Sequence, residues 1–309
     1  MSNENWYVQF PGGKKAELDA LKLIKGRKPQ VFVGMAHYEG RPDIGGARAL
    51  FSWASQGTIL DTQAGETGGS LLGRSFNALW AYALTEAKNN RVTHFAMLHG
   101  DCEAGRFWVD TLMEELIRTE ADVCATVIGI KDNRGLTSVA VDNPANEWQV
   151  YRRLTMHEVY EKLPETFSAD DVVAAGLCPP GHLLLANTGC WLADIRKPFW
   201  YRVGDDGSLL CHFEIRDRIH VTGEHKENLD VQVIPEDWGF SRTVGRLGGK
   251  VVCTRKVPVD HVGRAKWSNQ AVYGQWKHDE ECLGPAVKAE PATNEQGEPT
   301  HGDQRAALV

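Results

Sequence analysis

The sequence predicts an α/β protein with a mostly parallel central sheet flanked by helices. Short apolar runs alternate with amphipathic stretches along much of the 309-residue chain, which is the strand and helix order of such folds. The run from Thr93 to Leu98 is almost continuously apolar, as expected of a strand buried on both faces. It stops at the polar residues His99, Asp101 and Glu103. Since α/β proteins bind ligands beyond the carboxyl ends of their strands, this cluster is the first candidate site.

The composition is that of an ordinary globular chain, with 42% hydrophobic and 24% charged residues. A formal net charge of −7 disfavours a broadly basic nucleic-acid-binding surface, so a nucleic-acid acceptor is not expected. The seven cysteines include no C-x-x-C pair, which favours buried free thiols over a zinc ribbon or a disulfide framework. The first residues do not resemble a signal peptide, and no apolar run approaches ~18 residues. We therefore expect a cytoplasmic protein without a transmembrane segment.

The N-terminal half alternates between the two predicted kinds of element. We expect a lead-in helix within residues 1–28, then strands over 30–36, 57–62 and 121–130 and helices over 45–55, 70–89 and 107–119. The glycine-rich stretch 65–73 is neither a dinucleotide fingerprint nor a P-loop. Arg74 and Asn77, however, lie three residues apart near a predicted helix start, where backbone amides already favour anions. These two side chains suit a phosphate-bearing ligand.

The C-terminal half brings further polar residues to predicted strand ends. Asn187 to Gly189 interrupts two apolar runs, which usually marks a close backbone approach or a site. A strand starting at Val231 leads to Glu236 and Asp237, and His261 follows a strand that ends near residue 254. We predict one catalytic domain over 29–283, an insertion around 142–182 and a disordered tail over 284–309.

The acid and histidine clusters each follow a predicted strand, so a strand-helix sheet would gather them at one edge. A metal-diphosphate site with a separate general base explains this arrangement economically.

Several short motifs, in order along residues 30–264, resemble GT-A-fold glycosyltransferases of the family 2 kind. His94 to Glu103 resembles the strand with the D-x-D motif, and Leu72 to Asn77 resembles the R-x-x-N helix start. Asn187 to Leu192 is similar to the later glycine-containing strand. Pro235 to Arg242, then Gly248 to Val252, then Asp260 to Gly263 are similar to the E-D-x-x-F sequence, the following strand and the terminal H-x-G sequence.

The resemblance implies a GT-A fold with a smaller antiparallel acceptor-side region. It also implies a hexosyltransferase-like enzyme that moves a sugar from a nucleoside-diphosphate sugar to an acceptor hydroxyl. The acceptor would be a glycan, a protein or another hydroxyl compound, and Mn²⁺ or Mg²⁺ would bridge the diphosphate. Asp101, Glu103 and His261 would be metal ligands, Asp237 the base of an inverting reaction, and Glu236 an accessory group beside it. Donor contacts would come from Ala36, His37, Tyr38, Asp61, Arg74, Asn77, His99 and Gly100.

Alternatives remain at this point. The D-x-D pattern is either His99-Gly100-Asp101 or Asp101-Cys102-Glu103, and a histidine ligand would favour manganese over magnesium. His261 would otherwise be an ordinary loop histidine, and Asp237 a helix N-cap. The competing functions are a metal-dependent phosphohydrolase or nucleotidyltransferase and a non-catalytic protein that binds a nucleotide sugar or a glycan.

Overall fold

A mixed seven-stranded sheet forms the centre of the protein. The structure is a computed structural model that describes residues 28–37, 42–51, 53–56, 60–222, 228–263 and 265–277. β1, β2, β3, β5 and β13 run in one direction, whereas β10 and β8 run in the opposite one. The strands, in sheet order, are β2 (Asp61–Gly68), β1 (Gln30–His37), β3 (His94–His99), β10 (Cys190–Asp194), β5 (Val123–Thr126), β13 (Val251–Thr254) and β8 (Thr166–Ser168). The predicted α/β class with a largely parallel sheet is confirmed.

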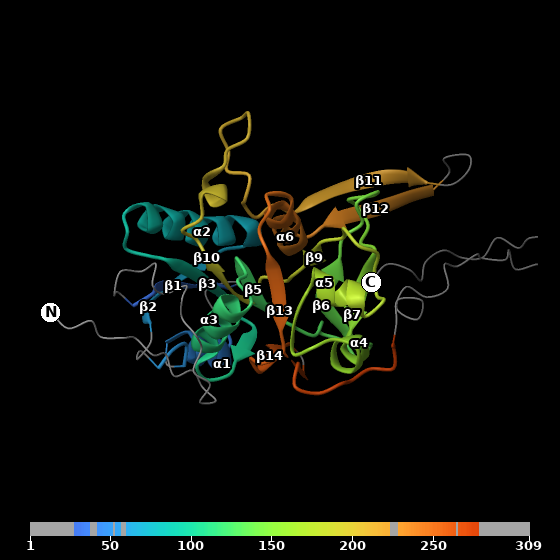
Figure 1. Ribbon diagram of the computed structural model, residues 1–309, viewed down its shortest axis with the longest axis horizontal. Helices are drawn as coiled ribbons and strands as arrows, with labels where there is room; N and C mark the ends of the chain where they lie inside the picture. The colour runs from blue at the N-terminus through green and yellow to red at the C-terminus, as the bar shows by residue number, and fades with distance from the viewer. Residues whose placement is uncertain are drawn as a thin grey trace, which may run out of the picture.

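Helices cover both faces of this sheet (Figure 1). The long helices are α1 (Ile44–Phe51), α2 (Leu72–Lys88), α3 (Trp108–Arg118) and α6 (Glu236–Arg246). β1 shows why two cores form, because successive side chains of a strand point to opposite faces. Phe32 and Ala36 join the core that contains residues of α2 and α6. Val31 and Met35 join the core that contains residues of α1 and α3.

An aromatic cluster fixes α2 and α6 to their face of the sheet. Phe213 and Phe240 stack with ring centroids 4.4 Å apart, and Trp80 contacts Phe240 edge-on at 5.5 Å. The indole N–H of Trp80 donates to the carbonyl of Cys211 at 2.8 Å. Such rings supply large buried area, and the tryptophan polar group keeps a partner inside the core.

Three smaller antiparallel sheets surround the central one, as the predicted antiparallel region requires. They are the sheet of β7 (Arg152–Thr155), β6 (Leu136–Val141) and β9 (Leu184–Leu185), the sheet of β15 (Lys266–Ser268), β14 (Val259–Val262) and β4 (Cys102–Ala104), and the ribbon of β11 (Arg216–Thr222) and β12 (Asn228–Ile234). The short helices are α4 (Met156–Glu161), α5 (Ala169–Ala174) and the 3-10 helix η2 (Pro198–Tyr201).

One sequence prediction needs correction. The second strand, predicted over 57–62, is Asp61–Gly68 and so includes part of the glycine-rich stretch. The segment 142–182, predicted as an insertion, supplies the edge strand β8 and places Val159 and Phe167 in the main core. The predicted lead-in helix and the tail 284–309 lie outside the described residues.

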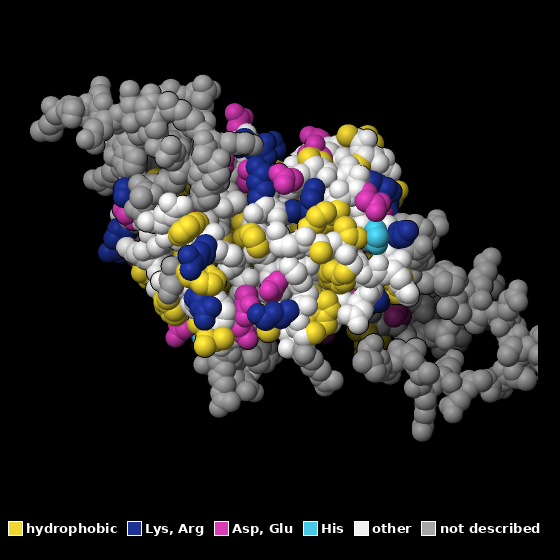
Figure 2. All heavy atoms as spheres, turned by 90° about the horizontal axis from the view of Figure 1, so that it is seen from below, with side chains coloured by type: hydrophobic (Ala, Val, Ile, Leu, Met, Phe, Trp, Pro, Cys, Tyr) yellow, Lys and Arg dark blue, Asp and Glu magenta, His cyan; other side chains and the backbone are white. Residues whose placement is uncertain are grey.

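The cysteines, the helices and the surface charges can each be set against the sequence predictions. The six described cysteines are all buried and unpaired, as predicted. Among the described residues, no helix combines the length and apolar character that crossing a bilayer requires. On the face in Figure 2, basic and acidic side chains are intermixed.

Burial of His94 at the start of β3 predicts a loss of stability in mild acid. The side chain is 2% exposed, and this burial lowers its pKa to about 4 against the partial compensation of Asp194. The unfolded chain binds a proton near pH 6.5 and the folded chain only near pH 4, so stability falls as the pH drops through this interval. Between pH 7 and pH 5 this histidine alone should cost about 2 kcal/mol.

Urea unfolding at both pH values measures this effect. His94→Gln should lose about 2 kcal/mol less than the unchanged protein on acidification. The half-buried His157 on α4 provides the matched control, since its substitution should leave the original pH dependence in place. An equal pH dependence in His94→Gln and the unchanged protein would contradict this assignment.

Candidate functional site

The candidate site lies at the edge of the sheet where β1, β3, β5 and β13 end. The strand β10 runs the other way, so the preceding residues Asn187 to Gly189 reach this edge too. The helix α6 runs from this edge back toward the start of β13, which places Glu236 and Asp237 in a first turn at the same end. The fold therefore brings together the polar clusters that the sequence places after separate strands.

Asp101 and His261 form the centre of this site. Asp101 follows β3 after one glycine, and His261 lies opposite Cys102 in the antiparallel pair of β14 and β4. The carboxylate oxygen Oδ2 of Asp101 lies 3.6 Å from Nε2 of His261. The backbone also links the two segments, because Val262 N–H donates to the carbonyl of Asp101 at 2.8 Å. Two residues 160 positions apart in the numbering thus form one polar centre.

Gly100 lets the chain turn into this centre beside β1. Its N–H donates to the carbonyl of Ala36 at 2.9 Å, and its carbonyl accepts from Asp43 N–H at 2.7 Å. A Cβ atom at this position would lie 2.7 Å from Cβ of His37, too close for an ordinary side chain. Glycine is therefore required by this close approach of the backbone.

The ring of His261 is held in a definite orientation. Its Nδ1 lies 2.9 Å from the carbonyl oxygen of Gly129, which can accept only from a protonated nitrogen. A neutral ring must then leave Nε2 unprotonated on the side of Asp101. This is the arrangement by which a backbone carbonyl prepares a histidine to bind a metal.

The donor set fits a divalent cation that completes its coordination with other ligands. Burial raises the pKa of Asp101, but the adjacent His261 ring and the Lys131 ammonium that contacts the carboxylate hold this pKa well below its usual range. Cys102 lies within reach of the same point, yet burial raises its thiol pKa well above the ordinary value. The protein therefore offers one carboxylate and one imidazole, and the Lys131 ammonium that contacts Asp101 would have to move aside.

Glu103 is not brought into this centre, which corrects its predicted role as a ligand. Cys102 and Ala104 point into the core, so the intervening Glu103 faces the other side of β4. Its carboxylate pairs with the ammonium of Lys266 and lies against Gly45 of α1. Among the described residues, the group of possible metal ligands contains Asp101, Cys102 and His261 and does not include Glu103.

Three buried polar atoms around the same edge have no hydrogen-bond partner among the described residues: Nδ1 of His37, Nε2 of His99 and Oγ1 of Thr188. Burial lowers the pKa of His99 to about 4, so this ring is neutral, and it stacks on Phe76 with centroids 4.7 Å apart. The backbone N–H of His99 donates to the backbone carbonyl of Gly189, the residue after Thr188. Because buried polar groups normally have partners, these atoms point to a polar ligand or water at this edge.

Asp237 occupies the first turn of α6 and is not its N-cap, which is Pro235. Burial, reinforced by the neighbouring Glu236, raises the pKa of Asp237 to about 8. Burial also raises the pKa of Glu236, which is 9% exposed. Trp238 holds this turn in place, because its indole N–H donates to the carbonyl of Ser138 at 2.9 Å.

Asp237 and His261 are positioned by the same short piece of sheet. The carbonyl of Gly129 accepts from His261, and Gly129 forms an antiparallel bridge with Thr137. The next residue, Ser138, accepts from the indole of Trp238 through its carbonyl. The Asp101–His261 pair and the carboxylate with the raised pKa therefore lie around one bridge. A carboxyl group with a pKa near neutrality is what general acid or base chemistry needs.

The other predicted donor contacts have different positions. Asp61 pairs with Gln30 at the start of β1, which places it at the opposite sheet edge and makes its prediction wrong. Asn77 uses its amide to bond both backbone groups of Phe213, at 2.7 and 2.8 Å. Arg74 is exposed on the first turn of α2, and Tyr38 lies outside the described residues. The roles of Arg74 and Asn77 toward a nucleotide stay predictions.

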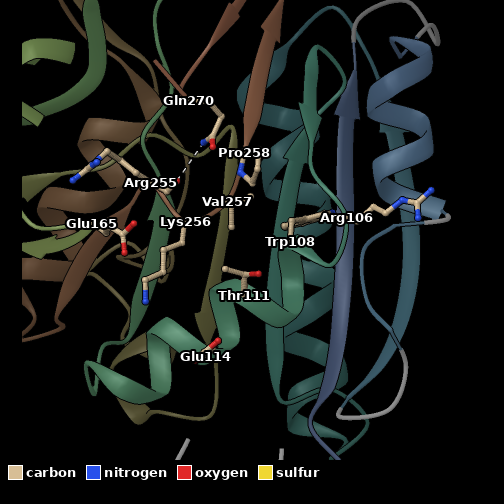
Figure 3. A pocket seen from close by; sticks show the side chains of 10 residues that line it. All are labelled: Arg106, Trp108, Thr111, Glu114, Glu165, Arg255, Lys256, Val257, Pro258 and Gln270. Atoms are coloured by element: carbon tan, nitrogen blue, oxygen red, sulfur yellow. Dashed lines mark hydrogen bonds between the residues drawn. The ribbon is translucent and has the colours of Figure 1, made fainter. Parts of the chain in front are cut away.

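A separate pocket of about 450 Å³ opens beside α3 (Figure 3). It contains none of the predicted site residues. Its lining comes from α3 and the chain before it, from the residue before β8 and from the chain after β13. It comprises Arg106, Trp108, Thr111, Glu114, Glu165, Arg255, Lys256, Val257, Pro258 and Gln270. With acids and bases mixed on its wall, it shows no preference for one charge of ligand.

Comparison with known proteins gives no family. No protein-family model matches the chain, and no curated protein matches it. A structural likeness exists to the crystal structure of A197 from STIV, at 11% identity and a TM-score of 0.43, covering 81% of this chain and 95% of that one. A likeness at this level assigns neither a fold family nor a function.

Two contacts at the site come from polar segments of the chain. The sequence offers Lys131, with Arg134 and Ser138, either as lining of a donor or acceptor cleft or as part of a solvated loop, and the structure places its ammonium in contact with Asp101. Thr188 was part of a recognised polar break, but nothing in the sequence marks its hydroxyl as unpartnered. The contact of Lys131 and the environment of the Thr188 hydroxyl both depend on how β3, β5 and β10 pack against one another.

Proposed function

We propose that this protein is a GT-A-type glycosyltransferase, hexosyltransferase-like, that transfers a sugar from a nucleoside-diphosphate sugar to an acceptor hydroxyl. The observation that carries the proposal is the pairing of Asp101 with His261 beyond the end of β3 in the central sheet. The ring of His261 is oriented by its contact with the carbonyl of Gly129. The order of the short motifs along the chain supports the same family. The acceptor would be a glycan, a protein or another hydroxyl compound, and inversion at the sugar carbon is the expected outcome.

Asp101 and His261 would hold the divalent cation, and the imidazole in this pair favours Mn²⁺ over Mg²⁺. Such a cation, when bound, stabilises negative charge on the departing diphosphate. The Lys131 ammonium, which contacts the same carboxylate, would move aside for this cation. The neutral ring of His99 and the hydroxyl of Thr188 offer hydrogen bonds to the polar parts of the donor.

Asp237 would remove the proton from the attacking acceptor hydroxyl. Its pKa of about 8 makes it a stronger base than an ordinary aspartate when it is ionised. Glu236 acts on it through charge, since the neighbouring carboxyl group helps to raise this pKa. The first turn of α6 thus supplies the base, and Trp238 fixes that turn to Ser138.

A metal-dependent phosphohydrolase or nucleotidyltransferase would use the same aspartate and histidine. Such enzymes often employ two metals about 4 Å apart and need additional carboxylates between them. The described residues contain one such group of three, and its cysteine is held as a thiol. This donor set favours glycosyl transfer with one cation.

Thermal unfolding with nucleotides tests the proposal. Nucleoside diphosphates and their sugar derivatives are added with and without Mn²⁺, at concentrations far above their dissociation constants. A ligand at 100 times its Kd stabilises by about 2.7 kcal/mol, which corresponds to roughly 5 °C for a chain of this size. We expect at least one diphosphate to produce this shift only with the metal present.

Measurements of product release, made alongside thermal unfolding, distinguish the rival functions. A hydrolase would release phosphate or nucleotide steadily without any acceptor, whereas a non-catalytic binder would be stabilised without ever releasing the sugar. Absence of stabilisation by every nucleoside diphosphate, with and without the metal, would refute the proposed function.

A further inference from the structure

The ribbon of β11 and β12 extends away from the body of the protein (Figure 1). Its two strands pair antiparallel from Arg216 opposite Ile234 to Thr222 opposite Asn228. A two-stranded ribbon is marginally stable by itself unless something covers an apolar face.

One face of this ribbon is apolar and exposed. Directly opposed residues share a face, so Ile219 lies beside Val231 and Val221 beside Leu229. The same face holds Val233 opposite Asp217, and Ile215 continues it toward the body. The six aliphatic side chains are between 45% and 73% exposed: Ile215, Ile219, Val221, Leu229, Val231 and Val233. We call these six residues the ribbon face.

The polar face of the ribbon, by contrast, is the one held against the protein. The guanidinium of Arg218 lies 4.2 Å from the ring centre of Trp148 and donates to Gln232 at 2.7 and 2.9 Å. Arg216 pairs with Glu147 at 3.2 Å. An antiparallel sheet with one solvated face normally buries its apolar side and exposes its polar side. The reversed order here indicates that the ribbon face is covered in the functional protein.

The charge of the ribbon argues for a protein partner over an anionic membrane surface. Residues 214–234 contain five acids and three lysines or arginines, and no tryptophan, tyrosine or phenylalanine. Membrane-surface elements are instead rich in basic residues and interfacial aromatic residues. Among the paired residues 216–222 and 228–234, Asp217 is the one charged residue on the apolar side, and it lies at the end nearer the body.

The pattern is self-complementary, which favours a second copy of the same chain. Two ribbon faces related by a twofold axis would stack as a small sandwich, with aliphatic side chains of each interdigitating and each Asp217 at the rim. Burial of the exposed parts would remove about 350 Å² of apolar surface per copy. The total of about 700 Å² is small, so association would be weak and reversible.

We propose that the ribbon face is a dimerisation surface through which two copies of this chain associate reversibly. The inference is independent of the proposed function. Sedimentation velocity between about 1 and 200 µM should show a concentration-dependent monomer–dimer equilibrium with a Kd in the micromolar range.

Charge substitutions at the centre of the ribbon face test the partner. Ile219→Glu and Ile219→Lys should each be monomeric over this range, because like charges would meet and be desolvated. An equimolar mixture of the two variants should recover dimers, since the opposite charges then meet. Ile44→Glu is the matched control: Ile44 is 75% exposed, close to the 72% of Ile219, but lies on α1, and its variant should dimerise normally.

Each alternative result has a definite meaning. A monomeric unchanged protein at every concentration, or normal dimerisation of Ile219→Glu, would overturn the proposal. If the unchanged protein is monomeric but floats with phosphatidylcholine–phosphatidylserine vesicles while Ile219→Glu does not, the ribbon face binds membranes instead. Because Ile219 is largely exposed, all variants should keep the unfolding temperature of the parent, which separates a lost interface from a lost fold.

Discussion

Replacing Asp101 by asparagine should abolish metal-dependent nucleotide binding and lower sugar transfer by about 10³-fold or more, because the cation loses its one carboxylate ligand and several kcal/mol of charge stabilisation. The fold should persist, since the backbone carbonyl of Asp101 still accepts from Val262. Calorimetric titration of Mn²⁺ with a nucleoside diphosphate measures the binding, and product formation measures the rate.

Glu103→Gln is the matched control for this substitution. It lies in the same D-x-D-like sequence but pairs with Lys266 on the other side of β4. Solvent screens such a surface pair, so its loss should affect stability little, and metal binding should be unchanged. If Glu103→Gln lost metal binding while Asp101→Asn kept it, the assignment of the ligand would be reversed.

Replacing Asp237 by asparagine should lower kcat by about 10² to 10⁴-fold while metal-dependent nucleotide binding is retained. With a pKa of about 8, this carboxyl group must lose its proton before it can act as a base. In the unchanged protein, kcat/KM should therefore rise with pH and level off above about pH 8. The variant should lose this rise, and Glu236→Gln should keep it with a shifted midpoint.

The same raised pKa gives a stability readout that separates catalysis from folding. The folded protein holds a proton on Asp237 up to about pH 8, whereas the unfolded chain releases it near pH 3.8. The stability that this proton contributes is present in acid and is lost as the pH rises through that interval. Relative to the parent, Asp237→Asn should thus be equally stable below about pH 3.8, increasingly more stable as the pH rises from there to about 8, and more stable by the full difference at pH 9. Normal sugar transfer by this variant would show that another group is the base.

If the catalytic proposal fails and the sedimentation result holds, the dimerisation surface remains valid, since neither Asp101 nor Asp237 belongs to the ribbon face. The two experiments therefore fail independently.

Much of the fold was predictable because local patterns determine it. The continuous apolar run before His99 predicts a strand covered on both faces, and β3 is an interior strand of the central sheet, between β1 and β10. The amphipathic stretches became α2 and α3 close to their predicted bounds. The start of β2 was misplaced, since glycine and polar residues at a sheet edge carry no apolar signal.

By itself, the sequence determined the elements and which polar residues follow the strands. The sequence could not decide whether His99 or Glu103 joins Asp101 as a metal ligand. Both residues lie two positions from Asp101, so along an extended chain both point to the same side as it does. In the tertiary structure the side chain beside Asp101 is that of His261, which the family resemblance offers as a second ligand, because β14 pairs with β4 in a register that sets His261 opposite Cys102. Pairing between distant segments depends on the whole packed sheet, and that is why only the folded protein decides the site.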